Sequence, residues 1–279
     1  MVDLDEYRQQ SAENWRAMAP GWKKRHDWLK ENNGPVNDWI VTRVDPQPAQ
    51  TWLDVAGGPG DLSLALAERV GDGGRVIYSD FAPEMVEVAR ELGAGRASIE
   101  FRLLDAERMD LDDDSVDGVG CRFGYMLMAD PAAALRETRR VLRDGGPLAF
   151  AVWSTPERNP WAAIPGMTLV QRGLAPPPDP TAPGMFAMGR PERIRELVTG
   201  AGFADPTIEE ISFAFHYADD DDLWDALVSL AGSLSRAVNA LPDEQRAATR
   251  TAVLENVSTY RNEDGSYNAP ASAWGVLAR

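Results

Sequence analysis

Hydrophobic and polar positions follow two alternating rhythms between residues 51 and 153. Short apolar runs bounded by turn residues alternate with longer runs in which apolar residues recur every three or four positions. The first rhythm predicts buried strands and the second predicts amphipathic helices, and their alternation is typical of βα units around a parallel sheet. The predicted strands are 51–56, 75–80, 98–105, 116–123 and 147–153, and the predicted helices are 61–71, 82–93 and 130–146.

The regular alternation ends after residue 153. The stretch 175–184 is too rich in proline for a helix or strand, which predicts a linker or surface loop. The predicted elements beyond are a helix at 191–203, a long strand at 206–218, two helices within 219–261 broken near Pro242, and a strand at 272–279. We therefore expect a helical segment over 1–46 and one domain over 47–279, with inserted lid segments at about 154–189 and 219–261.

The stretch LDVAGGPGDL, residues 53–62, lies where the first predicted strand gives way to a helix. Glycines at this place let the backbone approach a ligand closely, and the start of the helix favours an anionic group. Asp80 ends the next predicted strand, about 20 residues further on, where a carboxylate can accept hydrogen bonds from ribose hydroxyls. The pattern predicts a nucleotide-type ligand, and its structural alternative is a tight turn with a surface acid.

Two classes of nucleotide-type cofactor are separated by the spacing of these residues. A dinucleotide fingerprint would need Gly58, Gly60 and a third glycine, but Ser63 occupies the last position. A methyltransferase pattern needs an acid at the end of the first strand, a glycine turn, an acid after the second strand and another after the third. Asp54, Asp80 and Asp105 meet those requirements.

These residues, with LLDAERM and LRETRRVLRDGGPLAFAVW, make residues 51–153 resemble class I S-adenosylmethionine-dependent methyltransferases of the ubiquinone/menaquinone methyltransferase-like (methyltransferase type 11) branch. The resemblance implies an α/β, Rossmann-like sheet, mostly parallel with an antiparallel last strand, and S-adenosyl-L-methionine as cofactor. The chain departs from the family at two positions. Ala56 stands where the first glycine is usual, and Pro59, which lacks an N–H, stands where threonine is common.

The resemblance also implies a set of cofactor contacts. The turn would pass under the methionine part, an acid would hold the ribose, apolar residues would line the adenine, and an arginine would border the reaction centre. In this order the residues are Ala56, Gly57, Gly58 and Gly60; Asp80; Phe81 and Met85, with Asp105 and the N–H of Ala106 on the adenine edge; and Arg122. Phe81 and Met85 have a structural alternative, because apolar residues at a helix start also serve the core.

Candidates for a catalytic base are few. The loop after the fourth predicted strand, residues 123–130, offers Tyr125 and Asp130 as titratable groups, and the chain's two histidines are His26 and His216. His216 has apolar neighbours in a predicted strand, which favours a residue on the face of a sheet. We therefore expect proximity of the reactants to suffice, and the catalytic candidates remain Tyr125, His26 and His216.

Composition limits which binding partners and which cellular location we expect for the protein. The formal net charge of −16 disfavours nucleic acid and anionic membrane surfaces. Cys121 is the single cysteine, predicted to be a buried thiol, and no leader or membrane span is recognisable, so a cytoplasmic location is expected. The acidic tracts 110–114 and 219–222 are more typical of solvated turns and helix starts than of a metal site, and no metal is expected.

The sequence thus predicts an enzyme that methylates the oxygen or nitrogen of a small apolar or aromatic metabolite in secondary metabolism. A homodimer is compatible with the sequence. Three alternatives stay open: a quinone-precursor C-methyltransferase, an NAD-dependent oxidoreductase, and a non-catalytic protein that binds an adenosyl ligand.

Overall fold

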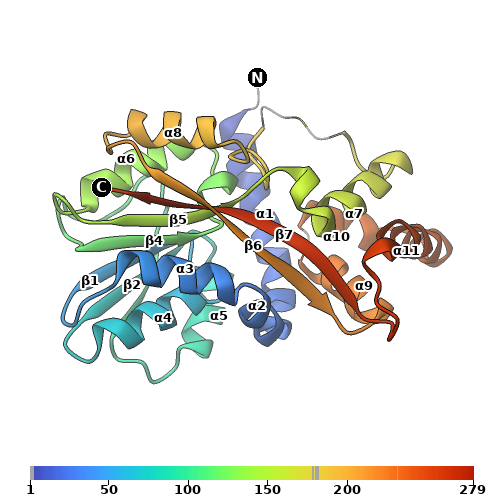
Figure 1. The fold of residues 1–279 in the computed structure, drawn as a ribbon, viewed down its shortest axis with the longest axis horizontal. Helices are drawn as coiled ribbons and strands as arrows, with labels where there is room; N and C mark the ends of the chain where they lie inside the picture. Colours follow the sequence, from blue (N-terminus) through green and yellow to red (C-terminus); the bar gives the residue numbers. More distant parts are fainter. Residues whose placement is uncertain (1–2, 178, 180–181, 231) are drawn as a thin grey trace.

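One seven-stranded sheet runs through the protein in the computed structural model, which describes residues 3–177, 179, 182–230 and 232–279 (Figure 1). The strand order is β3-β2-β1-β4-β5-β7-β6, and only β7 runs antiparallel to its neighbours. The predicted mostly parallel sheet with an antiparallel last strand is therefore confirmed. The strands are β1 (Thr51–Val55), β2 (Arg75–Asp80), β3 (Ile99–Leu103), β4 (Gly118–Arg122), β5 (Leu148–Trp153), β6 (Thr207–Tyr217) and β7 (Tyr267–Ala278).

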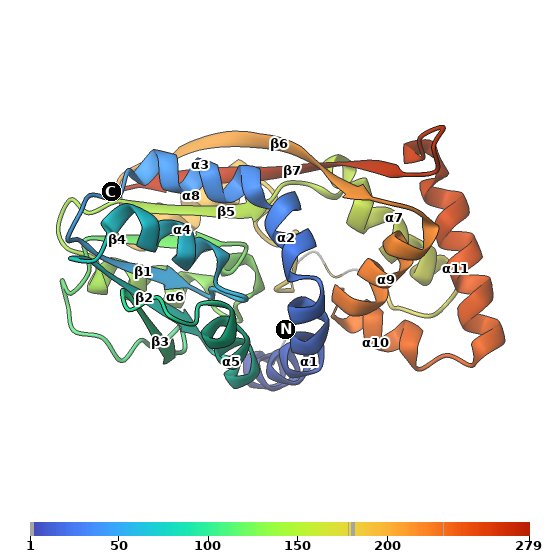
Figure 2. The same cartoon turned by 90° about the horizontal axis from the view of Figure 1, so that it is seen from below.

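Helices cover both faces of the sheet (Figures 1 and 2). On one face lie α3 (Gly34–Val44), α4 (Asp61–Val70) and α5 (Pro83–Leu92); on the other lie α6 (Pro131–Val141) and α8 (Pro191–Gly200). The apolar stripe of α4, formed by Leu62, Leu66 and Val70, is fully buried. Burial of apolar surface on both faces explains why the central strands are almost continuously hydrophobic.

The remaining helices gather beyond the carboxyl ends of the parallel strands. The helix α1 (Leu4–Lys24) leads into α2 (His26–Asn32), and α1 packs against α5 on one side and α9 on the other (Figure 2). We call the second group, carried by the far ends of β6 and β7, the extension; it consists of α7 (Pro160–Gln171), α9 (Asp220–Leu230), α10 (Ser233–Asn239) and α11 (Asp243–Val257).

Three predicted boundaries are wrong. The helix predicted over 130–146 ends at Val141, because the buried Leu142 takes an extended conformation and pairs with Val116. The tract 219–261 holds three α-helices rather than two, with an added break at Gly232, whose φ of 58° suits glycine. The final strand starts at Tyr267 rather than at residue 272, because β6 supplies partners along its full length.

The predicted proline-rich loop is described only in part. Residues 178, 180 and 181 lie outside the described residues, and the described residues of 175–184 contain no helix or strand. Among all described residues, no helix combines the length and the apolar character needed to cross a membrane.

Candidate cofactor and acceptor site

The glycine turn, residues 56–60, connects β1 to α4 at the carboxyl end of the sheet. Gly58 and Gly60 have φ values of 54° and 92°, and Ala56 has a φ of 53°, which is unusual for a residue with a side chain. Gly57 is closely packed, since a Cβ there would lie 2.6 Å from the ring of Tyr78. Tyr78 Oη also donates a hydrogen bond to the carbonyl of Gly58 at 2.7 Å. These contacts with Tyr78 hold the backbone of the turn in one conformation.

Asp80 lies directly beside this turn. Its carboxylate accepts hydrogen bonds from the backbone N–H groups of Gly58 at 3.1 Å and Ala82 at 2.9 Å. Burial raises the pKa of Asp80 to about 6, although these hydrogen bonds oppose the increase. The structure brings the predicted ribose acid and the glycine turn together, and ribose binding stays a prediction.

Two buried polar atoms near the turn have no hydrogen-bond partner among the described residues. One is Oδ1 of Asp54, whose Oδ2 accepts from Ser63 Oγ at 2.6 Å, and the other is Nε1 of Trp22. The Trp22 ring lies 3.9 Å from a Cβ built on Gly58. An unpaired buried polar group costs about 1–3 kcal/mol, so this acceptor and donor fit a site that takes a polar ligand.

The predicted adenine residues gather at the ends of β2 and β3. Phe81 is 38% exposed, Asp105 is exposed, and Ala106 is half-buried. Asp105 Oδ1 accepts from the N–H of Glu107 at 2.9 Å. Met85 is fully buried in the contact between α1 and α5, which agrees with its structural alternative, and its place at the adenine stays a prediction.

Arg122 lies in a buried ion pair that the sequence did not reveal. Its Nη2 donates to Oδ2 of Asp61 at 3.3 Å, and Oδ1 of Asp61 lies 2.8 Å from Nε2 of His26. Asp61 was overlooked because an acid in the first turn of a helix is ordinarily explained by the helix dipole. The structure thus places one histidine candidate, His26, beside the glycine turn.

The other two catalytic candidates differ in burial. Tyr125 is fully buried, its Oη lies 2.6 Å from Thr138 Oγ1, and burial raises its pKa well above the ordinary value. His216 is exposed on β6, as predicted for a residue on the face of a sheet. Asp130 caps α6 by accepting from the N–H of Ala133. Cys121 is buried, as predicted, and burial raises its pKa to about 12.

Aromatic side chains form a continuous cluster beyond the ends of β4 and β5, which we call the aromatic wall. Phe123 stacks on Trp153 with ring centroids 3.9 Å apart, and Trp153 meets Trp161 of α7 at 5.0 Å and Phe213 of β6 at 5.8 Å. Phe123 has a φ of 63°, an outlier for a bulky residue. The sequence did not predict this wall, because its members are far apart in the chain.

The chain segment that carries Phe123 contacts the glycine turn. A Cβ built on Gly124, which follows Phe123, would lie 2.8 Å from Cβ of Ala56. Phe123, Trp161 and Phe213 are half-buried, so part of each ring remains accessible. The site therefore has a polar part around the glycine turn and an aromatic part directly beside it.

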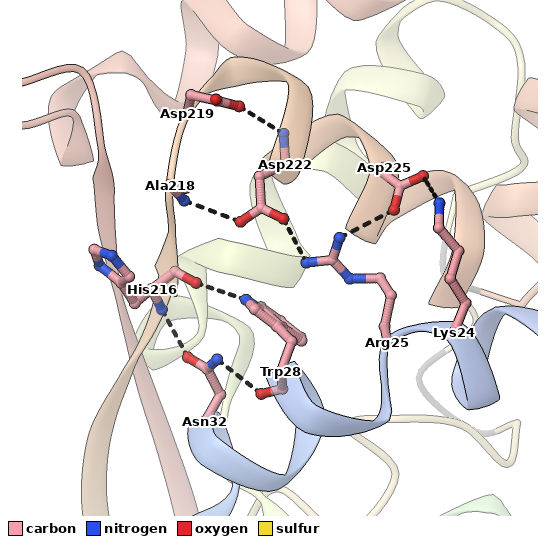
Figure 3. Close-up of polar contacts among 9 residues, drawn as sticks. All are labelled: Lys24, Arg25, Trp28, Asn32, His216, Ala218, Asp219, Asp222 and Asp225. Carbon is pink, nitrogen blue, oxygen red and sulfur yellow. Dashed lines mark hydrogen bonds and ion pairs between the residues drawn. The ribbon is translucent and has the colours of Figure 1, made fainter.

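A cluster of polar contacts joins the α1–α2 junction to the extension (Figure 3). The Arg25 side chain, 8% exposed, donates to Asp222 at 2.8 Å and to Asp225 at 3.0 Å, and it lies over the ring of Trp28. Trp28 Nε1 donates to the carbonyl of His216 at 2.7 Å. The acidic residues of α9 thus pair with cationic side chains, and the N-terminal helices are fastened to the far end of β6.

Comparisons with known proteins agree with this architecture. The ubiE/COQ5 methyltransferase family matches residues 36–163. The solved structure of a putative methyltransferase from Bacillus halodurans, 22% identical, aligns with a TM-score of 0.56 over 87% of this chain and 97% of that one. Residues 36–163 are thus similar to a family of methyltransferases, and the chain shares the fold of the solved structure.

Two bacterial methyltransferases are similar in sequence to about half of this chain. Demethylmenaquinone methyltransferase of Deinococcus radiodurans is 33% identical over 54% of this chain and 66% of its own length. The protein of the same name from Clavibacter sepedonicus is 39% identical over 56% of this chain and 62% of its own. The chain thus spans less than two thirds of the length of these relatives, and the family match ends before β6, β7 and most of the extension.

Proposed function

We propose that the chain transfers a methyl group from S-adenosylmethionine to a small acceptor that carries an aromatic or quinonoid ring. The aromatic wall is the observation that carries the proposal, because it presents stacked rings beside the glycine turn. A planar ring packs well against such a surface. The names of the two bacterial relatives favour a quinone precursor over the O- or N-methylated secondary metabolite expected from the sequence.

Residues of this chain have two tasks in that reaction. Bound S-adenosylmethionine would supply an electrophilic methyl group, which the acceptor atom attacks in line with the C–S bond so that S-adenosylhomocysteine leaves. The glycine turn and Asp80 hold the cofactor, while the aromatic wall orients the acceptor and excludes water, which is the main requirement for such a displacement. Since Tyr125 is buried in the core and His216 lies on the exposed side of β6, neither takes the acceptor's proton.

The test is turnover with a panel of acceptors. The purified chain, given S-adenosylmethionine and a reduced demethylnaphthoquinone, a simple phenol or an aromatic amine, is assayed for S-adenosylhomocysteine release and for the mass of one added methyl group. We expect the ring-bearing quinol to be methylated on carbon. Cofactor binding without turnover of any acceptor would favour the non-catalytic alternative instead.

The wall offers its own control. Replacing Phe123 by leucine removes the stacking on Trp153 and is expected to raise the acceptor KM by about tenfold, the loss of roughly 1.4 kcal/mol of aromatic contact. The matched control is Phe101→Leu. Phe101 lies on the edge strand β3 and packs against Tyr78 of β2. Equal effects of the two substitutions on the acceptor KM would count against the wall as the acceptor site.

The proposal extends to the surroundings of the enzyme. The substrate is a small molecule rather than a nucleic acid, in keeping with the net charge of −16. The single cysteine, which is buried, suits a reducing cytoplasm. A homodimer remains part of the proposal, and sedimentation of the purified chain measures it.

A further inference from the structure

His26, Asp61 and Arg122 form a buried network of charged side chains beside the glycine turn. Their side chains are 12%, 1% and 7% exposed, respectively. They come from α2, from the first residue of α4 and from the last residue of β4. The network therefore joins the N-terminal helices to the two strand ends, β1 and β4, between which the polar part of the site lies.

Asp61 needs both of its partners. A carboxylate removed from water is strongly destabilising unless charges and hydrogen bonds compensate it. Arg122 Nη2 occupies one carboxylate oxygen at 3.3 Å and His26 Nε2 the other at 2.8 Å. The positive charge of Arg122 also lowers the pKa of Asp54, although burial outweighs this effect. Arg122 is thus placed near both Asp61 and Asp54.

The contacts of the His26 ring favour a role in holding Asp61 over a role as a catalytic base. Nε2 faces Asp61 at 2.8 Å, and Nδ1 faces Asp27 at 3.3 Å. Both ring nitrogens of His26 thus lie next to carboxylates of this chain. The geometry suits a residue that holds Asp61 in place.

Asp54 and Arg122 together offer one acceptor and one set of donors. Oδ1 of Asp54 is buried with no partner among the described residues, and a guanidinium carries five N–H groups in a fork that matches a carboxylate. An α-amino acid has a cationic ammonium and an anionic carboxylate on the same carbon. The paired charges of this site are therefore complementary to an amino-acid zwitterion.

We propose that His26 is a positioning residue for the binding of the amino-acid end of S-adenosylmethionine. His26 holds Asp61, and Asp61 holds Arg122, so that the guanidinium receives the carboxylate while Asp54 accepts from the ammonium. This inference rests on the proposed function, because it requires that S-adenosylmethionine binds at the glycine turn. It assigns His26 to the cofactor rather than to proton transfer.

The test compares two ligands by calorimetry. S-adenosylhomocysteine carries the amino-acid end, whereas 5′-methylthioadenosine keeps the adenine and ribose but lacks that end. His26→Ala and Arg122→Ala are expected to weaken S-adenosylhomocysteine binding about tenfold or more while changing methylthioadenosine binding less than about twofold. His26→Gln keeps an N–H donor and is expected to restore most of the lost affinity. Asp80→Ala is the control that weakens both ligands.

The possible outcomes separate a positioning role of His26 from a merely structural role and from a role as a base. An equal loss for both ligands in His26→Ala, or no rescue by His26→Gln, would show a merely structural role and overturn the proposal. A fall in kcat with unchanged affinity for both ligands would make His26 a base and also overturn it. If the unaltered chain binds neither ligand, the proposed function itself fails. A raised KM for S-adenosylmethionine with a smaller change in kcat supports the proposal.

Discussion

Two acidic residues at the carboxyl ends of β1 and β2 hold protons more tightly than they would in water. Burial raises the pKa of Asp54 to about 7 and that of Asp80 to about 6. An ordinary aspartic acid titrates near 4, so the folded chain binds more protons than the unfolded chain between those values. These acids suit a ligand, because a hydrogen-bond donor of the ligand would compensate the free-energy cost of burying a carboxylate.

The first prediction concerns pH. Because the unfolded state binds fewer protons between pH 4 and 7, the free energy of unfolding of the ligand-free chain is expected to fall by roughly 2–4 kcal/mol from pH 5 to pH 7. The lowered pKa values of Glu137, Glu210 and Asp225 matter only at more acidic pH. Urea unfolding at both pH values measures the difference, which Asp80→Asn should reduce. Stability that rises between pH 5 and 7 would contradict it.

The second prediction tests Asp80 as the ribose acid. Asp80→Ala is expected to weaken S-adenosylhomocysteine binding by about 1.5–3 kcal/mol, the range for hydrogen bonds to a charged group. Affinity of the unaltered chain should also fall as pH drops below about 6, because the protonated acid accepts fewer hydrogen bonds. Calorimetry gives both values. An unchanged dissociation constant in a folded variant would rule out this role.

The third prediction concerns the backbone of the glycine turn. Ala56 has a φ of 53°, a conformation that costs a residue with a Cβ about 1 kcal/mol relative to glycine. Ala56→Gly is therefore expected to stabilise the chain by about that amount in urea unfolding. Ala65→Gly, in the middle of α4, is the matched control and should destabilise by about 1 kcal/mol. The same sign for both substitutions would refute the strain argument.

At the scale of elements, the α1–α2 junction determines how the N-terminal helices sit on the rest of the fold. Arg25 reaches Asp222 and Asp225 of α9, while the next residue, His26, reaches Asp61 of α4. Trp28 and Asn32 of α2 bind the backbone of His216 in β6 (Figure 3). The α1–α2 junction thus contacts both the start of α4, at the carboxyl ends of the parallel strands, and the extension.

The fourth prediction follows from this junction. Arg25→Ala removes the cationic partner of Asp222, one of the two cationic partners of Asp225, and the contact with Trp28, so it is expected to lower the free energy of unfolding by about 2 kcal/mol. Arg16→Ala breaks the exposed pair with Glu84 and should cost less than about 1 kcal/mol. Chemical denaturation compares the two. Similar losses would show that Arg25 contributes no more than a surface pair.

At the scale of the whole molecule, the carboxyl ends of the parallel strands are enclosed from two sides. The helix α1 lies between α5 and α9, and β6 and β7 carry the extension outward past the ends of the parallel strands (Figure 2). A pocket of about 380 Å³ lies beside the contact between α1 and the extension, lined among others by Met18, Gly21 and Arg236. The helices themselves approach closely, since a Cβ built on Gly21 would clash with the carbonyl oxygen of Ser229.

The fifth prediction concerns movement of the extension and of the segment that leads into it. We propose that the segments 154–189 and 219–261 act as the lid expected from the sequence, closing when both reactants are bound. Hydrogen exchange in α7 and α9 should then slow when S-adenosylhomocysteine and the acceptor are present together. The core strand β1 serves as the control and should not change. Strong protection of α7 and α9 in the free chain would show a fixed structure instead.

Local signals in the sequence predicted the parts of the site that lie within single βα units. The glycine turn and Asp105 each follow a strand, Asp80 is the last residue of β2, and the carboxyl ends of neighbouring parallel strands meet at one edge of the sheet. Met85 packs against α1, a contact that the sequence did not predict, because an apolar residue at a helix start faces whichever element packs there. Asp61 and the aromatic wall were missed, because their partners are separated by long stretches of chain.

The sequence alone determined the class of sheet, the position of the glycine turn and the cofactor class, because hydrophobic periodicity and turn residues act over a few residues. Only the tertiary structure decided which side chains complete the site. His26 meets Asp61, Arg25 meets Asp222, and Phe123 meets Trp153 through contacts between distant segments. Such contacts depend on how helices and strands pack together, and no local pattern in the chain records the packing.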